Sequence, residues 1–110
     1  MTIAEMPEYI RRASVLLSAS ERQEIVDHLA THPKAGVLLA ETGGIRKLRW
    51  GRAGQGKSGG VRIIYYFHSE AMPLYLLTLF AKNEQANISK EERNELARLA
   101  ALLVRTWIGR

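Results

Sequence analysis

The chain has 110 residues, with 16 Lys and Arg against 11 Asp and Glu, so its formal net charge is +5 and its pI is near 9.9. This length predicts one domain over residues 1–110, and 46% hydrophobic residues favour a folded globule over a disordered chain. The absence of cysteine excludes a disulfide scaffold, a thiol nucleophile and a zinc site with cysteine ligands.

The N-terminal third predicts a short edge strand at 1–4 and then a helical hairpin. The first helix begins near Pro7, because proline suits the first helical turn. The second begins near Ser20, where the four residues to Gln23 have the pattern of a capping box. It ends near His32, since a proline follows and disfavours helical geometry in the residue before it. The expected apolar faces are Ile10, Ala13 and Leu17, then Ile25, Val26, Leu29 and Ala30.

The rest of the chain predicts three strands, at Ile45 to Trp50, Val61 to Phe67 and Leu74 to Ala81. The third strand is apolar on both alternating faces, which indicates a central strand of the sheet that is covered on both sides. Short connections between consecutive strands favour an antiparallel meander. A capping box at Ser89 to Glu92 opens a last helix, with Leu96, Leu99, Leu103 and Trp107 on one face. The predicted fold class is therefore α+β.

Positive charge is concentrated in one segment. Between Ile45 and Arg62 there is no acidic residue, whereas the rest of the chain is nearly balanced. The basic residues of this segment are Arg46, Lys47, Arg49, Arg52, Lys57 and Arg62. A patch of one sign attracts polyanions, and phosphate backbones are the commonest cellular example. The alternative is a basic loop that serves only solubility.

One run of this segment, Gly51 to Ser58, matches the phosphate-loop pattern G-x-x-x-x-G-K-[ST]. That loop works between a strand and a helix, whose N-terminal amides hold the phosphates. Here a predicted strand follows, so we interpret the match as coincidental and the run as a hairpin loop.

The alternation of side chains along a strand sorts the basic residues. Lys47 and Arg49 share one face, and Arg62 on the next strand can converge with them. Lys82 and Asn83 follow the third strand, where a sheet end presents polar groups. Together these residues would hold a phosphate from several sides. Arg62 carries the most weight, because a charge in an otherwise apolar strand is unfavourable without a partner.

Histidines and tyrosines give weaker signals. His28 and His32 are four residues apart, a spacing compatible with a metal, but no third ligand lies near them in sequence, so we expect no metal and no cofactor. His68 is a candidate general acid or base only if the fold brings it to the basic residues. Tyr65 and Tyr66 are expected either in the core or stacked on a base.

No segment of the sequence indicates a membrane protein. The longest apolar run without a charge, Ala71 to Ala81, is shorter than the roughly 20 residues that cross a bilayer. The first residues include Glu5 and Glu8 and lack the basic-then-apolar order of a signal peptide. We therefore expect a cytoplasmic protein with no membrane partner.

Three runs stand out together: Thr42 to Trp50, Gly56 to Tyr66 and Ala81 to Glu84. They resemble the HigB branch of the RelE-type toxins, and the resemblance extends from Pro7 to the final helix. It implies a RelE-like microbial RNase fold and a toxin of a type II toxin–antitoxin pair that cuts messenger RNA on the ribosome. It also implies a cognate antitoxin, commonly a helix-turn-helix repressor in this branch.

The resemblance implies roles for single residues. Arg62 matches the strand arginine of the R-[LI]-[VI]-Y motif, which implies phosphate binding and transition-state stabilisation. Lys47 matches an RNA-contacting basic residue, and Arg49 accompanies it. Lys82 matches the first residue of the family's K-R-E, whereas Asn83 replaces the arginine that supports catalysis in better-known members. Their later tyrosine has no equivalent here. The candidate catalytic residues are Arg62, Lys82, Lys47 and Asn83, and the candidate RNA-binding residues are Arg46, Arg49, Arg52, Lys57, Tyr65 and Tyr66.

We therefore expect a ribosome-dependent mRNA endonuclease that needs no metal, in which the ribose 2′-hydroxyl attacks the neighbouring phosphate. Two alternatives stay open. One is a non-catalytic RNA- or DNA-binding module that uses the same basic patch. The other is an inactive toxin that acts only through its antitoxin complex, and the substitution at Asn83 keeps it open.

Overall fold

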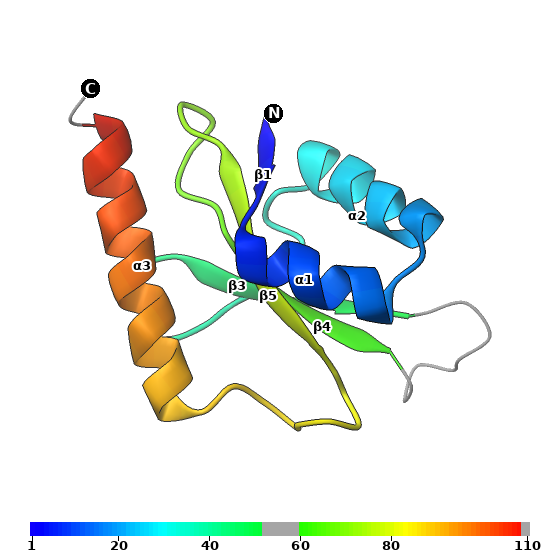
Figure 1. Cartoon of the computed structure of the whole chain (residues 1–110). Coiled ribbons are helices and arrows are strands. Elements are labelled where there is room, and N and C mark those ends of the chain that lie inside the picture. Colours follow the sequence, from blue (N-terminus) through cyan, green and yellow to red (C-terminus); the bar gives the residue numbers. More distant parts are fainter. Residues whose placement is uncertain (52–59, 109–110) are drawn as a thin grey trace.

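A five-stranded sheet and three helices make up the described part of the computed structural model, which covers residues 1–51 and 60–108 (Figure 1). The predicted α+β fold class is confirmed. In chain order the elements are β1 (Ile3–Glu5), α1 (Pro7–Leu16), α2 (Ala19–Thr31), β2 (Val37–Leu38), β3 (Ile45–Trp50), β4 (Val61–Tyr66), β5 (Leu74–Ala81) and α3 (Lys90–Ile108).

The strands lie in the order β1-β5-β4-β3-β2. The predicted meander of β3, β4 and β5 is antiparallel throughout, and β5 lies between two strands as expected. The sheet as a whole is mixed, because β1 pairs with β5 in parallel, with Ile3 opposite Leu74. A tight hairpin turn would force two neighbouring strands to be antiparallel. β1 is followed by helices instead, so it can lie parallel to its neighbour β5. β2 was not predicted, since two residues are too few to show a periodic pattern.

The helical hairpin of α1 and α2 covers one face of the sheet, as predicted (Figure 1). This core contains Tyr9, Ala13, Leu17, Ile25, Leu29, Leu48, Val61, Ile63, Tyr65, Leu74, Leu76 and Leu79. One predicted core position is wrong, because Ile10 is 43% exposed and its neighbour Tyr9 is fully buried. Tyr9 and Ala13 are four residues apart and so lie on the same side of α1.

Capping boxes begin two of the helices. In α2 the cap is Ser18 rather than the predicted Ser20: its Oγ accepts from the Glu21 backbone N–H at 3.1 Å, and the Glu21 carboxylate accepts from the Ser18 N–H at 2.9 Å. The sequence fits a capping box at either Ser18 or Ser20, and a cap at Ser18 lets helical geometry begin at Ala19. The predicted end near His32 and the predicted cap of α3 at Ser89 are confirmed.

The second face of the sheet is only partly covered, by α3. Its core contains Ile45 of β3 and Ile64 and Tyr66 of β4, and the predicted side chains Leu96, Leu99, Leu103 and Trp107 pack against it. Ile45 and Tyr66 are paired at one end of these two strands, and Trp50 and Val61 are paired at the other. The helix therefore packs on the Ile45 end of this face.

The part of the chain between β3 and β4 lies mostly outside the described residues, including Arg52 and Lys57. Val61, just after it, begins a strand and not a helix. This supports the interpretation that the phosphate-loop pattern at Gly51 to Ser58 is coincidental. None of the described helices is long and apolar enough to cross a lipid bilayer.

A first prediction concerns the packing of α2 on the sheet. Leu29 is fully buried, whereas Val15 on α1 is 83% exposed. We expect Leu29→Ala to lower the free energy of unfolding by about 2–5 kcal/mol, because it removes buried methyl groups and leaves a cavity. Val15→Ala is the control and should change it by less than about 0.5 kcal/mol. Urea unfolding followed by circular dichroism measures both, and equal effects would contradict this assignment of the core.

Candidate functional site

Two arginines lie directly opposite each other on the part of the second face that α3 does not cover. Arg49 of β3 and Arg62 of β4 are paired in the antiparallel ladder, so their side chains project to the same side. Arg62 is only 7% exposed, whereas Arg49 is exposed to solvent. Their convergence, predicted from strand alternation, is confirmed. The β5 neighbour of Arg62 is the buried Phe80, so the arginine is flanked by an apolar ring and a second cation.

This arrangement is electrostatically costly. Like charges directly opposite each other on a sheet are destabilising. Within residues 1–51 and 60–108, no carboxylate forms an ion pair with either arginine. Arg62 Nη1 has a backbone acceptor, the carbonyl of Val61, at 3.4 Å. Burial lowers the pKa of Arg62, and the positive charge of Arg49 lowers it further. The guanidinium nevertheless stays charged at neutral pH.

A cavity of about 370 Å³ opens beside the two side chains. The described residues that line it are Arg49, Trp50, Gly51 and Arg62, and we call it the arginine cavity. Two planar guanidinium groups offer charge-assisted hydrogen bonds to phosphate oxygens. An anion in this cavity would remove the repulsion between the arginines, so the site is suited to a phosphodiester.

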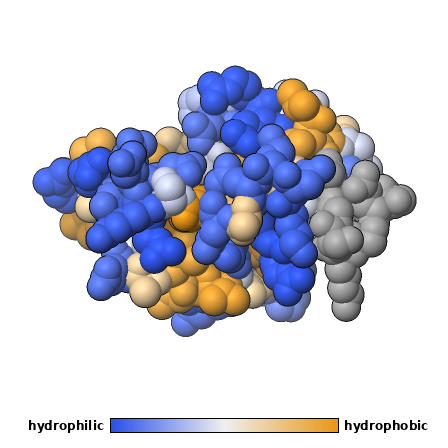
Figure 2. All heavy atoms as spheres, turned by 90° about the horizontal axis from the view of Figure 1, so that it is seen from below, coloured by the Kyte–Doolittle hydropathy of each residue, from blue (hydrophilic) through white to orange (hydrophobic). Residues whose placement is uncertain are grey.

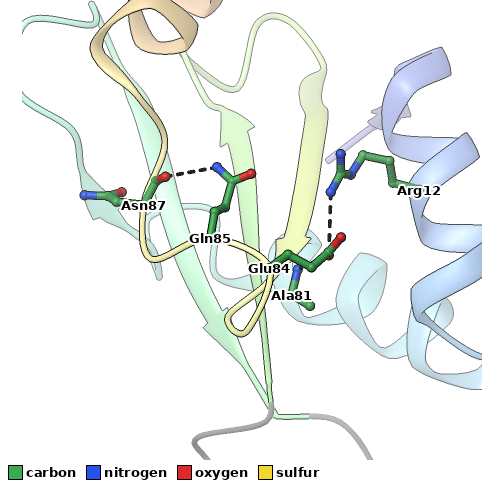
Figure 3. Close-up of polar contacts among 5 residues, drawn as sticks. All are labelled: Arg12, Ala81, Glu84, Gln85 and Asn87. Carbon is green, nitrogen blue, oxygen red and sulfur yellow. Dashed lines mark hydrogen bonds and ion pairs between the residues drawn. The ribbon is translucent and has the colours of Figure 1, made fainter.

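Lys47 lies two residues before Arg49, on the same face of β3, as predicted. Its Nζ donates to Oδ1 of Asn87, 3.2 Å away, in the connection between β5 and α3. The same Oδ1 accepts from the N–H of Ile88 at 3.0 Å. The Asn87 carbonyl accepts from Gln85 Nε2 at 2.9 Å, as Figure 3 shows. The connection is thus held against Lys47. Sequence reasoning missed Asn87, because the two residues are 40 positions apart and no motif joins them.

The predicted residues Lys82 and Asn83 lie in a turn at the end of β5. The Lys82 N–H donates to the carbonyl of Gly60 at 3.1 Å, which places the turn beside the start of β4 and hence near Arg62. Both side chains are exposed. Glu84 accepts from the Ala81 N–H at 2.8 Å and faces Arg12 of α1 at 3.6 Å (Figure 3). Its carboxylate therefore closes the turn and does not line the arginine cavity.

Arg46 and Tyr65, predicted to bind RNA, lie on the opposite face of the sheet from the arginine cavity. The same alternation that joins Lys47 and Arg49 turns Arg46 away, and it is paired with Tyr65. Tyr65 is fully buried, and burial raises its pKa. Its hydroxyl accepts from the Gly36 N–H and donates to the Pro33 carbonyl, both at 2.8 Å. The prediction that Tyr65 lies in the core is confirmed, and the alternative prediction, that it stacks on a base, is wrong.

Tyr66 and His68 are also remote from the arginine cavity. Tyr66 is 3% exposed and packs in the core beneath α3, so its predicted availability to a base is wrong as well. Its hydroxyl lies 3.4 Å from His68 Nδ1, and both line a separate cavity of about 320 Å³ with α3. The fold does not bring His68 to the basic residues, which was the condition for a role in proton transfer.

Among the described residues, no group of three His, Cys, Asp or Glu side chains is placed to hold a metal ion. His28 and His32 stack on each other with ring centroids 5.1 Å apart, and His28 also contacts the ring of Trp50.

The molecule is seen from below in Figure 2, the side on which the β5–α3 connection runs in Figure 1. Hydrophilic residues cover most of this face, with hydrophobic areas between them.

A family model described as the RelE toxin of the RelE / RelB toxin–antitoxin system matches residues 17–107. The match covers most of the chain. It includes both strands that carry the paired arginines, and the connection that carries Lys82, Asn83 and Asn87.

A second prediction concerns anion binding by the arginine cavity. Inorganic phosphate should raise the melting temperature more than chloride at equal ionic strength, because it binds between Arg49 and Arg62 in the folded state only. At ten times its dissociation constant it would add about 1.4 kcal/mol. Arg62→Gln should abolish the difference between the two salts, whereas Arg11→Gln on the exposed side of α1 should keep it. The same difference in all three proteins would contradict the site.

Proposed function

Since this chain belongs to the RelE family of toxins, we propose that it is an endoribonuclease that cuts messenger RNA on the ribosome and thereby stops translation. The family match makes it a toxin of a toxin–antitoxin system. Within the family we assign it to the HigB branch, on the runs around Arg49, Arg62 and Lys82. We propose that the whole chain acts as one domain, in the cytoplasm, where ribosomes and mRNA are found.

The observation that carries this proposal is the pairing of Arg49 and Arg62 at a cavity. A buried arginine that faces a second arginine has a clear use if the protein binds a phosphate group. In phosphoester cleavage, negative charge builds on the non-bridging oxygens in the transition state. Donors already fixed by the strands stabilise that charge without rearranging. Lys47, two residues away on the same face, adds a third cation.

The proposed reaction needs no metal. The 2′-oxygen attacks the adjacent phosphorus, its proton passes to a base, and the bond from phosphorus to the 5′-oxygen breaks. The 5′-oxygen leaves with a proton, so the products are a 2′,3′-cyclic phosphate and a 5′-hydroxyl. Arg62 and Arg49 hold the non-bridging oxygens. Our candidates for proton transfer are Lys47, on the same face of β3 as Arg49, and Lys82, in the turn beside the start of β4.

Dependence on the ribosome is part of the proposal. The described lining of the arginine cavity contains no histidine and no carboxylate, the usual groups for proton transfer. A substrate held in line for attack lowers the barrier by positioning alone. The ribosome holds mRNA in a defined geometry, and it would supply what the cavity lacks. We further propose a cognate antitoxin, in this branch a helix-turn-helix protein.

A non-catalytic role is the alternative that a specific observation favours. Asn83 replaces the arginine of the family motif, and Glu84 of that motif is tied to Arg12 on the other side of the turn. A toxin without catalytic activity would still bind RNA through the arginine cavity, or act only through its antitoxin complex. Such a protein would bind RNA more weakly as salt rises, but would leave transcripts intact.

A third prediction tests the proposed activity. Expression of the chain in bacteria should stop growth, and a short pulse should produce mRNA cuts at codon boundaries, mapped by sequencing of 5′ ends. Arg62→Ala should lower cleavage by about a hundredfold or more, which is roughly the loss from removing one oxyanion donor. Arg11→Ala is the control, because Arg11 is exposed on α1 and pairs with Glu8. Circular dichroism checks that both variants are folded.

The same experiment separates the alternatives. Intact transcripts together with salt-sensitive RNA binding by the wild type would identify a binding module. Intact transcripts without RNA binding would identify a protein that acts through its antitoxin complex. Either result contradicts the proposed endonuclease.

A fourth prediction concerns the contact between Lys47 and Asn87. Asn87→Ala removes the acceptor that holds the lysine, and it should lower the cleavage rate about tenfold, equivalent to roughly 1.4 kcal/mol in the barrier. Gln85→Ala is the matched control, because Gln85 donates to the Asn87 backbone and not to Lys47. Single-turnover cleavage on programmed ribosomes measures both. Equal losses would mean that Asn87 acts by shaping the connection and not through Lys47.

A further inference from the structure

We propose that His32, at the end of α2, is a stacking platform for an unpaired base of the bound RNA strand. This inference rests on the proposed function, because it takes the strand whose phosphate occupies the arginine cavity as its ligand. It concerns a different surface, on the other side of Trp50, which neither the family match nor the predicted chemistry assigns.

Three rings form a column that begins at Trp50, the last residue of β3. The Trp50 ring packs against the core beneath α1 and α2 and contacts His28 edge-on, with ring centroids 5.5 Å apart and an interplanar angle of 61°. His28 then stacks on His32, with centroids 5.1 Å apart and an angle of 21°. His28 is half-buried and His32 is exposed. The column thus leads from the end of β3, next to Arg49, to a ring at the surface.

Next to the column is a hollow of about 370 Å³, lined by His28, His32, Pro33, Lys34 and Ala35, which we call the imidazole hollow. Two imidazole rings, a proline ring and a methyl group give it flat, largely apolar walls, and no described lining residue is acidic. Flat rings beside a cation are what single-stranded RNA-binding proteins present to unstacked bases.

The ring of His32 is fixed by its neighbours before any ligand binds. Thr31 Oγ1 lies 2.8 Å from His32 Nδ1, and it also donates to the carbonyls of Asp27 and His28 at 3.2 and 3.1 Å. These contacts hold the His32 ring in place at the end of α2.

Two cations, Lys34 and Arg46, lie at the imidazole hollow. Lys34 lines it, and Arg46 donates from Nη1 to the carbonyls of Lys34 and Gly36 at 3.4 and 2.9 Å. Arg46 is absent from the arginine cavity, but it lies beside this second surface. Cations at the arginine cavity and at the imidazole hollow can each bind a phosphate of one RNA strand that passes around Trp50. The presence of cations at both surfaces favours RNA over an apolar protein segment.

The test uses short single-stranded RNAs made uncleavable by 2′-O-methyl groups, with 2-aminopurine at successive positions. One position should lose fluorescence on binding the wild-type protein, because the base stacks on His32. His32→Ala should remove this quenching and weaken binding about tenfold at low salt, whereas His32→Phe, which keeps a flat ring, should stay within about twofold. His68→Ala, an exposed histidine elsewhere, is the control and should change neither.

Several results would overturn the subsite. They are no quenching by the wild type at any position, equal losses in His32→Ala and His32→Phe, or an unaffected His32→Ala. If His32→Ala lost affinity for ribosomes but not for the RNAs, the base would belong to ribosomal RNA and the proposal would be wrong. Cleavage of mRNA is scored separately. Stacking without cleavage would support the subsite and refute the endonuclease. Cleavage without stacking would refute the subsite and support the endonuclease.

Discussion

Every side chain of β4 is buried, and this constraint determines where the rest of the molecule can present charge. Alternate residues of the strand face α1 and α2 on one side and the second core on the other. The side facing α1 and α2 is apolar throughout. On the second side α3 packs on the Ile45 end, so the residue at the other end of β4 can be a cation. That residue is Arg62. If α3 also covered this end of β4, the position of Arg62 would lie in an apolar core and would require an apolar residue.

The two faces of β3 divide the basic segment into two surfaces. Lys47 and Arg49 project beside Arg62, whereas Arg46 projects toward the end of α2 and bonds to the backbone of Gly36. Trp50 at the end of the strand borders both surfaces. A strand of six residues thus carries cations to both faces. An extended polyanion such as RNA, with a phosphate at every nucleotide, can engage two such surfaces at once.

Much of the fold can be predicted from sequence, because strand and helix periods are local properties. The bounds of β3 and β5, the cap of α3 and the convergence of Arg49 with Arg62 all follow from spacing alone. The errors arise where a tertiary contact decides between equivalent local choices. Tyr9 replaces Ile10 in the core because α1 is rotated against the sheet. The contact between Lys47 and Asn87 depends on the path of a whole connection, which no short pattern encodes.

The sheet is bordered by its two shortest strands, β1 with three residues and β2 with two. Each leaves few backbone groups unpaired, and Val37 and Leu38 of β2 are exposed to solvent. Short edges of this kind prevent the sheets of separate copies from joining edge to edge, which is the first step of many aggregates. The long, apolar strands β4 and β5 are kept inside these borders. The two borders therefore leave little unpaired backbone on which the sheet of a second copy could continue this one.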